Sequence, residues 1–107
     1  MITNFKIFEN DDNPYYYVGD IVECVYGTEG VVEAPKDGKK YLVLRIYEVI
    51  YNIEGESTIT DYKYVTEKDI YNFDVDIKDI ETGKVLVQWS SYRFISEIRT
   101  TTNKFNI

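Results

Sequence analysis

The segment YLVLRIYEVIYNI, Tyr41–Ile53, restricts the fold of this chain more than any other stretch. It is rich in Val, Ile and Tyr on both faces, and such β-branched and aromatic side chains fit a pleated strand better than a helix. We expect so long a strand, apolar on both sides, to bend and to contribute to two sheets of a barrel. The segment therefore predicts an all-β protein.

The rest of the chain shows short strand patterns separated by turn signals, with no long helical period. Asp37-Gly38 is the strongest hairpin signal, and Gly27 with Gly30 indicates a reversal. The segment Thr66–Ile70 begins with a capping pattern and predicts a single helical turn. We predict strands at Thr3–Ile7, Asp20–Tyr26, Val31–Glu33, Thr58–Val65, Phe73–Ile80, Val85–Trp89 and Ser90–Ile98. The predicted fold class is all-β, a small antiparallel barrel or sandwich with at most one short helical turn.

Length and composition are those of one globular domain. The chain has 107 residues, of which 44% are hydrophobic and 29% charged, so we expect a single small β domain over residues 1–107. Cys24 is the only cysteine and cannot form an internal disulfide, which favours a reducing compartment. No apolar run is long enough to cross a bilayer, so the expected location is the cytoplasm.

The residues of the chain do not suggest catalysis. Histidine is absent, which removes the usual general base and the commonest metal ligand. Cys24 lies among apolar residues and is expected to be a small buried side chain. The stretch DVDIKDIETG resembles a calcium loop only superficially, because it lacks the required fifth-position ligand and sixth-position glycine. We predict no enzymatic activity, no cofactor and no metal.

Acidic residues are concentrated in one part of the chain. The net charge is −7, and the segment Glu54–Glu81 alone has nine acids and three lysines. In a strand over Phe73–Ile80, Asp74 and Asp76 would form a short negative row that Lys78 interrupts. The predicted acidic partner-binding surface comprises Glu54, Glu56, Asp61, Glu67, Asp69, Asp74, Asp76 and Asp79. The alternative is that this acidity only keeps a small β protein soluble and protects its strand edges.

Aromatic residues supply two further candidate surfaces. The chain has 11 tyrosines, and tyrosine suits contact surfaces because its ring is apolar and its hydroxyl polar. The run Tyr15, Tyr16 and Tyr17 is one candidate for contact with a protein partner. The other lies in the C-terminal stretch, where the local charge is positive. That alternative ligand face comprises Trp89, Tyr92, Arg93 and Arg99, although Trp89 is also a candidate for the core.

The stretch YVGDIVECVYGTEGVVEAPKDGKKYLVL is similar to the opening of many SH3-like small barrels. It resembles in particular the C-terminal barrel of the YopX-type phage proteins. The matching positions are Tyr17, Gly19, Asp20, Ile21, Val22, Gly30, Val31 and Val32. This resemblance covers about a quarter of the chain, and its motif is structural. It implies an SH3-like fold and a phage or mobile-element origin, and it brings no active site.

These observations predict a small acidic protein-interaction module. One form of this hypothesis is a phage or mobile-element inhibitor that mimics DNA and binds a host nucleic-acid-binding or defence protein with a basic surface. The first alternative is an SH3-like or OB-like barrel that binds a small molecule or single-stranded nucleic acid through its C-terminal aromatic and basic strand. The second is a structural subunit of a phage assembly. The net charge disfavours direct binding to nucleic acid, no membrane contact is expected, and the oligomeric state is left open.

Overall fold

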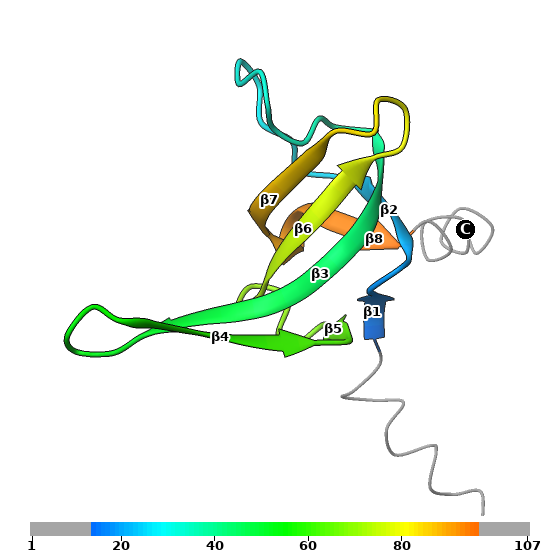
Figure 1. Cartoon of the computed structure of the whole chain (residues 1–107). Helices are drawn as coiled ribbons and strands as arrows, with labels where there is room; N and C mark the ends of the chain where they lie inside the picture. The colour runs from blue at the N-terminus through cyan, green and yellow to red at the C-terminus, as the bar shows by residue number, and fades with distance from the viewer. Residues whose placement is uncertain (1–13, 97–107) are drawn as a thin grey trace, which may run out of the picture.

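Strand β3 (Lys40–Tyr51) is the longest element of the computed structural model, which describes residues 14–96. The strand predicted at Tyr41–Ile53 is therefore confirmed, and it curves along its length (Figure 1). Opposite β6, Val43 pairs with Ile77 and Arg45 with Asp76, so one extra β3 residue forms a bulge.

The bulge in β3 decides which of its side chains face the core. Tyr41 and Val43 are buried before it, and Ile46 is buried after it. Strict alternation would have buried residue 45 instead, because side chains two apart share one face. The extra residue moves the pattern by one, so that the apolar side chains stay inside and Arg45 stays exposed.

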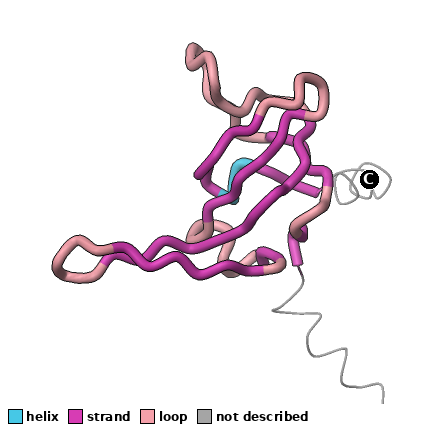
Figure 2. The backbone as a smooth tube through the Cα atoms, in the orientation of Figure 1, coloured by secondary structure: helices cyan, strands magenta, loops and turns pink. Residues whose placement is uncertain are grey.

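The described residues form eight strands and one 3-10 turn (Figures 1 and 2). Besides β3, they are β1 (Pro14–Tyr17), β2 (Ile21–Cys24), β4 (Ser57–Tyr62), β5 (Tyr64–Thr66), β6 (Asp74–Asp79), β7 (Val85–Ser90), η1 (Ser91–Arg93) and β8 (Phe94–Ser96). Every strand pair is antiparallel. The predicted small all-β antiparallel fold with at most one short helical turn is confirmed.

Residues 14–96 form two sheets. The larger has the order β7-β6-β3-β2-β8, with β4 added to the end of β3, and the smaller pairs β1 with β5. Both sheets supply one core, in which Tyr16 and Val65 of the small sheet join Val22, Val75 and other apolar residues of the large one. Phe94 of β8 is buried there with its ring edge-on to Tyr41, and Trp89 packs half-buried at the margin.

The loop between β2 and β3 differs from the prediction. Residues 25–39 contain no strand, so the strand predicted at Val31–Glu33 is wrong. The Lys36 ammonium group donates to the carbonyl oxygens of Thr28 and Val31. A side chain thus bonds carbonyl groups that a neighbouring strand would pair in a sheet. The predicted turn at Asp37-Gly38 is present, and in it the Lys39 N–H donates to the Lys36 carbonyl at 3.1 Å.

Two other boundaries are corrected. The strand predicted at Thr58–Val65 breaks at Lys63, where the chain leaves β3 and turns into β5. The predicted helical turn at Thr66–Ile70 is a hydrogen-bonded turn instead, in which the Asp69 N–H donates to the Thr66 carbonyl. The 3-10 turn lies at η1, inside the stretch predicted as the strand Ser90–Ile98. The predicted strand Thr3–Ile7 lies outside the described residues.

Replacing Tyr16 by Phe tests the contact between β1 and η1. The Tyr16 side chain is 1% exposed, and its hydroxyl donates to the Ser91 carbonyl at 2.7 Å. Without this bond the buried carbonyl loses its hydroxyl donor, so we expect the free energy of unfolding to fall by about 1–2 kcal/mol in urea denaturation. The control is Tyr17→Phe, at an exposed ring, which should change stability by less than about 0.5 kcal/mol. Equal effects of the two substitutions would contradict this role of Tyr16.

Candidate functional site

Three tyrosines from distant parts of the sequence form an exposed cluster. Tyr26 follows β2, Tyr71 lies in the turn before β6, and Tyr92 belongs to η1. The Tyr92 ring centroid lies 6.0 Å from that of Tyr26 and 5.5 Å from that of Tyr71. Tyr71 is 78% exposed and Tyr26 is 62% exposed, so both rings are open to contact. We call Tyr26, Tyr71 and Tyr92 the tyrosine cluster.

Backbone hydrogen bonds hold the cluster in place. The N–H groups of Val25 and Tyr26 both donate to the Arg93 carbonyl, at 2.7 and 3.3 Å, and tie the first loop to η1. Ser91 is fully buried, and its N–H donates to the Phe73 carbonyl at 3.0 Å while its hydroxyl donates to the Ile70 carbonyl. The segments that present the three rings are therefore fastened to each other through η1.

An apolar hollow lies beneath the cluster. Its volume is about 180 Å³, which suits one or two side chains rather than a whole cofactor. It is lined by Tyr15, Val25, Tyr26, Ile70, Tyr71, Tyr92, Phe94 and Ile95. Exposed rings around an apolar floor offer contact area without a charged group, so the arrangement fits binding better than acid-base chemistry.

Arg93 joins the cluster to the single tryptophan. Its guanidinium carbon lies 5.4 Å from the Trp89 ring centroid and 5.6 Å from that of Tyr92. One terminal nitrogen donates to the Tyr26 carbonyl at 2.9 Å and to the Thr28 hydroxyl at 3.2 Å. The predicted ligand face of Trp89, Tyr92 and Arg93 is thus brought together, whereas Arg99 lies outside the described residues.

The three candidate tyrosines of β1 have different surroundings. Tyr16 belongs to the core and has no surface to offer, so the structure contradicts its placement in a binding surface. Tyr15 is half-buried and lines the hollow. Tyr17 is exposed and lies against Tyr64, with ring centroids 5.4 Å apart. Only Tyr15 therefore adjoins the tyrosine cluster.

Most of the predicted acidic surface is engaged in contacts within the chain. Asp61 binds the Arg45 guanidinium at 2.6 Å, and this hydrogen bond lowers the pKa of Asp61. Asp69 accepts from the Thr66 hydroxyl at 3.0 Å. Asp76 accepts from the Tyr47 hydroxyl at 2.7 Å and from a backbone N–H of β7 at 2.9 Å. These carboxylates stabilise the fold, and Asp79 does the same at the end of β6.

The remaining candidate acids are spread over separate elements. Glu54 and Glu56 lie in the turn between β3 and β4, where Glu56 accepts from the Asn52 amide at 2.9 Å. Glu67 is exposed in the turn after β5, and Asp74 is half-buried at the start of β6. The predicted row on β6 is therefore short, because Asp76 is already bonded and Asp79 is buried.

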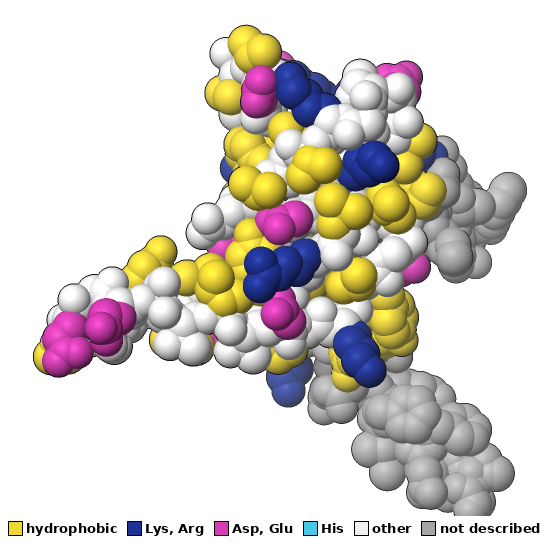
Figure 3. Space-filling view, viewed as in Figure 1, with side chains coloured by type: hydrophobic (Ala, Val, Ile, Leu, Met, Phe, Trp, Pro, Cys, Tyr) yellow, Lys and Arg dark blue, Asp and Glu magenta, His cyan; other side chains and the backbone are white. Residues whose placement is uncertain are grey.

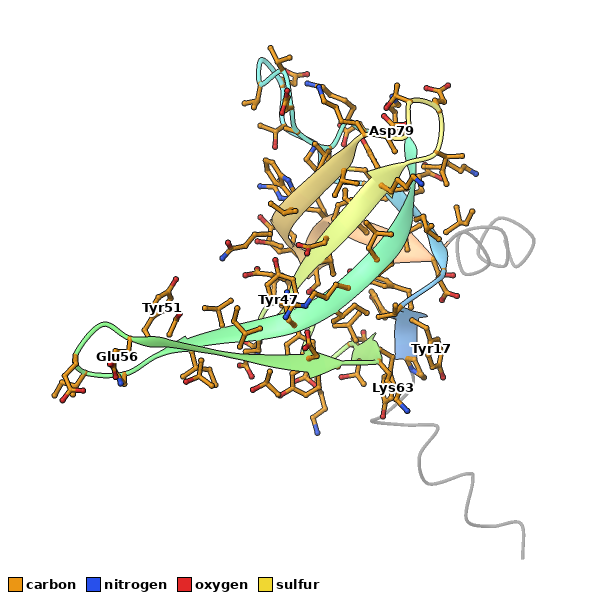
Figure 4. The ribbon with its side chains drawn as sticks, in the orientation of Figure 1. Tyr17, Tyr47, Tyr51, Glu56, Lys63 and Asp79 are labelled. Carbon is orange, nitrogen blue, oxygen red and sulfur yellow. The ribbon has the colours of Figure 1, made fainter. Side chains whose placement is uncertain are left out.

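A second hollow, of about 290 Å³, contains three lysines, and each of them already has a partner. Lys39 binds Asp79 at 2.8 Å and Glu81 at 3.3 Å. Lys84 binds Glu33 at 3.0 Å, while Lys36 bonds the backbone of its own loop. Asp79 also lines the hollow, at the end of β6 and beside the start of β3 (Figure 4). Because its lysines already have partners, this hollow is a weaker candidate than the tyrosine cluster.

Cys24 is a core residue, as its neighbours in the sequence predict. Its side chain is buried, and burial raises the pKa of the thiol to about 11. The thiol is therefore protonated at neutral pH and is a poor nucleophile.

Sequence reasoning singled out Tyr92 but missed Tyr26 and Tyr71. These two are far apart in the chain, and only the fold brings their rings to Tyr92. A signal was available in the sequence, since Tyr26 precedes the Gly27 turn and Tyr71 follows the Asp69-Ile70 turn. An aromatic ring at a polar turn has little opportunity for burial by its own strand.

No protein family, curated protein or solved structure significantly matches the chain. No helix among residues 14–96 is long and apolar enough to cross a membrane. Within the same described residues, no three His, Cys, Asp or Glu side chains are grouped so that they could hold a metal ion. Function is therefore inferred from the contacts and exposure of the chain's own residues.

Replacing Asp79 by Asn tests the role of its carboxylate. Burial raises the pKa of Asp79, but hydrogen bonds from Lys39 and from the N–H groups of Glu81 and Thr82 outweigh burial and lower it overall. The ionised form thus stabilises the fold above the unfolded-state pKa of about 3.9, and this stabilisation is lost as the pH falls through the lower folded-state value.

We expect Asp79→Asn to lower the free energy of unfolding at pH 7 by about 1–3 kcal/mol. The difference from the wild type should shrink as the pH falls below about 4, as measured by urea denaturation across pH. The matched control is Glu81→Gln, which removes the exposed partner of the same Lys39 and should have little effect. A difference for Asp79→Asn that stays constant between pH 7 and pH 3 would contradict the assignment.

Proposed function

We propose that the protein is a non-enzymatic interaction module that binds an extended segment of another protein across the tyrosine cluster. One observation carries this proposal: the exposed rings of Tyr26 and Tyr71 lie on either side of the half-buried Tyr92 ring, and all three line one apolar hollow. Large exposed aromatic groups are uncommon away from contact surfaces, and tyrosine is enriched where proteins bind proteins.

The spacing of the rings favours an extended ligand. In a polyproline II chain the rise is about 3.1 Å per residue, so side chains two apart lie about 6 Å from each other. The ring centroids of the cluster are 5.5 and 6.0 Å apart, which is nearly the same spacing. Prolyl or aliphatic side chains of such a segment would fit between Tyr26, Tyr92 and Tyr71. Aromatic grooves bind polyproline II segments in this way because the ligand loses little conformational entropy.

Charge indicates what else the segment carries. The chain has a net charge of −7, so a positively charged partner is attracted and a phosphate backbone is repelled. Arg93 already donates to Tyr26 and Thr28 and stacks on two rings, which leaves it less able to bind phosphate. We therefore propose a partner whose binding segment contains lysine or arginine.

A second candidate is binding of single-stranded nucleic acid or a small aromatic molecule at the same face. The stacking of Arg93 on Trp89 and Tyr92 favours it, since bases stack on such groups. The repulsion between the acidic chain and phosphates disfavours the nucleic acid. An uncharged aromatic ligand is free of that repulsion.

The sequence resemblance bears on the wider biological setting. The SH3-like and YopX-type resemblance supports a phage or mobile-element origin, with the host cytoplasm as the location and a host protein as the partner. Inhibition by DNA mimicry would rely on Glu54, Glu67 and Asp74. The other five predicted acids are engaged within the chain: Glu56, Asp61, Asp69, Asp76 and Asp79. We therefore assign the principal contact to the tyrosine cluster and a steering role to the acidic residues.

Substitution of Tyr71 by Ala tests this function. The probes are short arginine-containing proline-rich peptides selected from a display library on the wild-type protein. Fluorescence of Trp89, the only tryptophan, reports on binding because Arg93 links it to the cluster. We expect Tyr71→Ala to weaken binding of the selected peptides at least about tenfold, since a few large aromatic residues contribute most of the affinity at such interfaces.

The matched control is Tyr51→Ala, which removes another exposed tyrosine far from the cluster and should leave peptide affinity unchanged. Replacing arginine by glutamate in the peptide should weaken binding at low salt. Selection of peptides whose affinity is the same for wild type and Tyr71→Ala would contradict the proposed site. Tight binding of an oligothymidylate in place of peptides would favour the second candidate.

A further inference from the structure

The end of β3 and all of β4 form an arm that leaves the body of the protein. The arm comprises residues 48–62, and Figures 1 and 2 show it extending as a two-stranded ribbon past the other strands. Every residue of β4 is exposed, including Ile59 at 48%. At the turn Ile53 is 97% exposed. These isoleucines are therefore not covered by the described body, whereas Tyr62 at the base of the arm stacks on Phe73 with ring centroids 4.3 Å apart.

The turn at the end of the arm is well ordered by hydrogen bonds. The side-chain oxygen of Asn52 accepts from the N–H groups of Glu54 and Glu56, both at 2.9 Å. The Asn52 N–H donates to the Glu56 carbonyl at 2.9 Å, and the Gly55 N–H donates to the Asn52 carbonyl at 3.0 Å. The arm is thus a preformed ribbon, although isolated two-stranded ribbons are only marginally stable in water.

One edge of β4 has no strand beside it in the part of the chain that the structure describes. β4 pairs only with β3 there, in a register that places Ile59 opposite Val49. The Asn52 N–H donates to the Glu56 carbonyl, so these two residues form a hydrogen-bonded pair of the ladder. Because hydrogen-bonded and non-hydrogen-bonded pairs alternate between antiparallel strands, Ser57, Ile59 and Asp61 direct their N–H and C=O groups away from β3. Such an edge is a template for pairing with another strand.

We propose that this edge pairs with the same edge of a second copy, forming a two-fold symmetric dimer through antiparallel β4 strands. Two arms would then form one four-stranded sheet, which gives each ribbon the additional strands it needs. The surface is separate from the tyrosine cluster, since none of its residues belongs to the arm. The dimer would therefore leave that cluster open.

Cross-strand neighbours favour one register. With Ile59 on the two-fold axis, Ile59 meets Ile59 of the second copy, Thr58 meets Thr60, and Ser57 meets Asp61. A shift by two residues would instead place Ile59 opposite Asp61, and a shift by four would place Asp61 opposite Asp61. Like charges directly opposite each other are destabilising, so the register centred on Ile59 is preferred.

The charges of the arm are self-complementary in that arrangement. Glu54 and Glu56 lie in the turn, and Lys63 lies at the other end of β4, where the chain bends into β5. Figure 4 shows Glu56 and Lys63 at opposite ends of the strand, and Figure 3 shows acidic side chains gathered at the free end of the arm. In the antiparallel pair Glu56 of one copy is opposite Tyr62 of the other, next to Lys63, whose carbonyl accepts from the Val18 N–H at 2.9 Å and ends the free edge. Each acidic turn therefore meets the basic end of the other arm.

Mass measurement in solution tests the proposal first. Light scattering or sedimentation over a wide concentration range, at about 0.15 M salt, should show a reversible transition from the chain mass of 12.6 kDa to twice that mass. Ile59→Lys would place two lysines on the axis and should weaken the dimer at least about tenfold. The matched control is Val32→Lys, at an 88% exposed position in the loop between β2 and β3 and outside the arm, which should leave the dimer intact.

A charge exchange gives the sharper test. Lys63→Glu alone and the double variant Glu54→Lys with Glu56→Lys should each dimerise at least about tenfold more weakly. In either variant the turn of one copy and residue 63 of the other carry the same charge and repel. A mixture of the two variants should restore dimers, since both contacts in the mixed pair are again between opposite charges. A monomer at all concentrations would overturn the proposal, as would a dimer that neither variant weakens. A monomer would instead favour a strand of a different protein as the partner of the β4 edge.

Discussion

Strand β3 is the element on which the rest of the structure depends. Its first half pairs with β2 and β6 and contributes Tyr41, Val43 and Ile46 to the core. Its last four residues, 48–51, pair with β4 alone among the described residues. The bulge after Val43 keeps apolar side chains inside while the strand curves, so one continuous element belongs to both the body and the arm.

Ser91 connects the core to the candidate binding surface. Its carbonyl accepts from buried Tyr16, and its own donors bond the backbone at Ile70 and Phe73. Tyr71 lies between those two residues, and Tyr92 follows Ser91 directly. The positions of exposed rings are thus determined by buried hydrogen bonds, which cost free energy when broken and leave little freedom for the segments that carry them.

The sequence predicted the fold class because strand patterns and turn signals are local. The strand at Tyr41–Ile53 was found to within a few residues, and Cys24 was correctly placed in the core. The strand predicted at Val31–Glu33 failed because bonds from the Lys36 side chain replace a ladder there. Apolar residues on both faces of β3 predicted a strand that contributes to two sheets of a barrel, and this was wrong. β3 belongs to the larger sheet alone, and Ile50 lies on an arm that the described body leaves uncovered.

The candidate site was harder to predict because it depends on distant contacts. An abundance of tyrosine indicated a contact surface without saying which tyrosines form it. Tyr16 proved to be core, and Tyr26 and Tyr71 were brought to Tyr92 by the fold. Acidic residues were equally ambiguous, since a carboxylate such as Asp76 is used within the chain by donors from β3 and β7 that no local pattern specifies.

Hydrogen exchange along β3 tests most directly the claim that one strand serves two structures. In dilute solution, where copies are apart, mass spectrometry of peptides covering residues 40–47 and 48–62 should give very different rates. We predict that the first segment exchanges at least about a hundredfold more slowly than the second, because core burial protects only the first. Equal protection of both segments in dilute solution would contradict the division of β3 into a body half and an arm half.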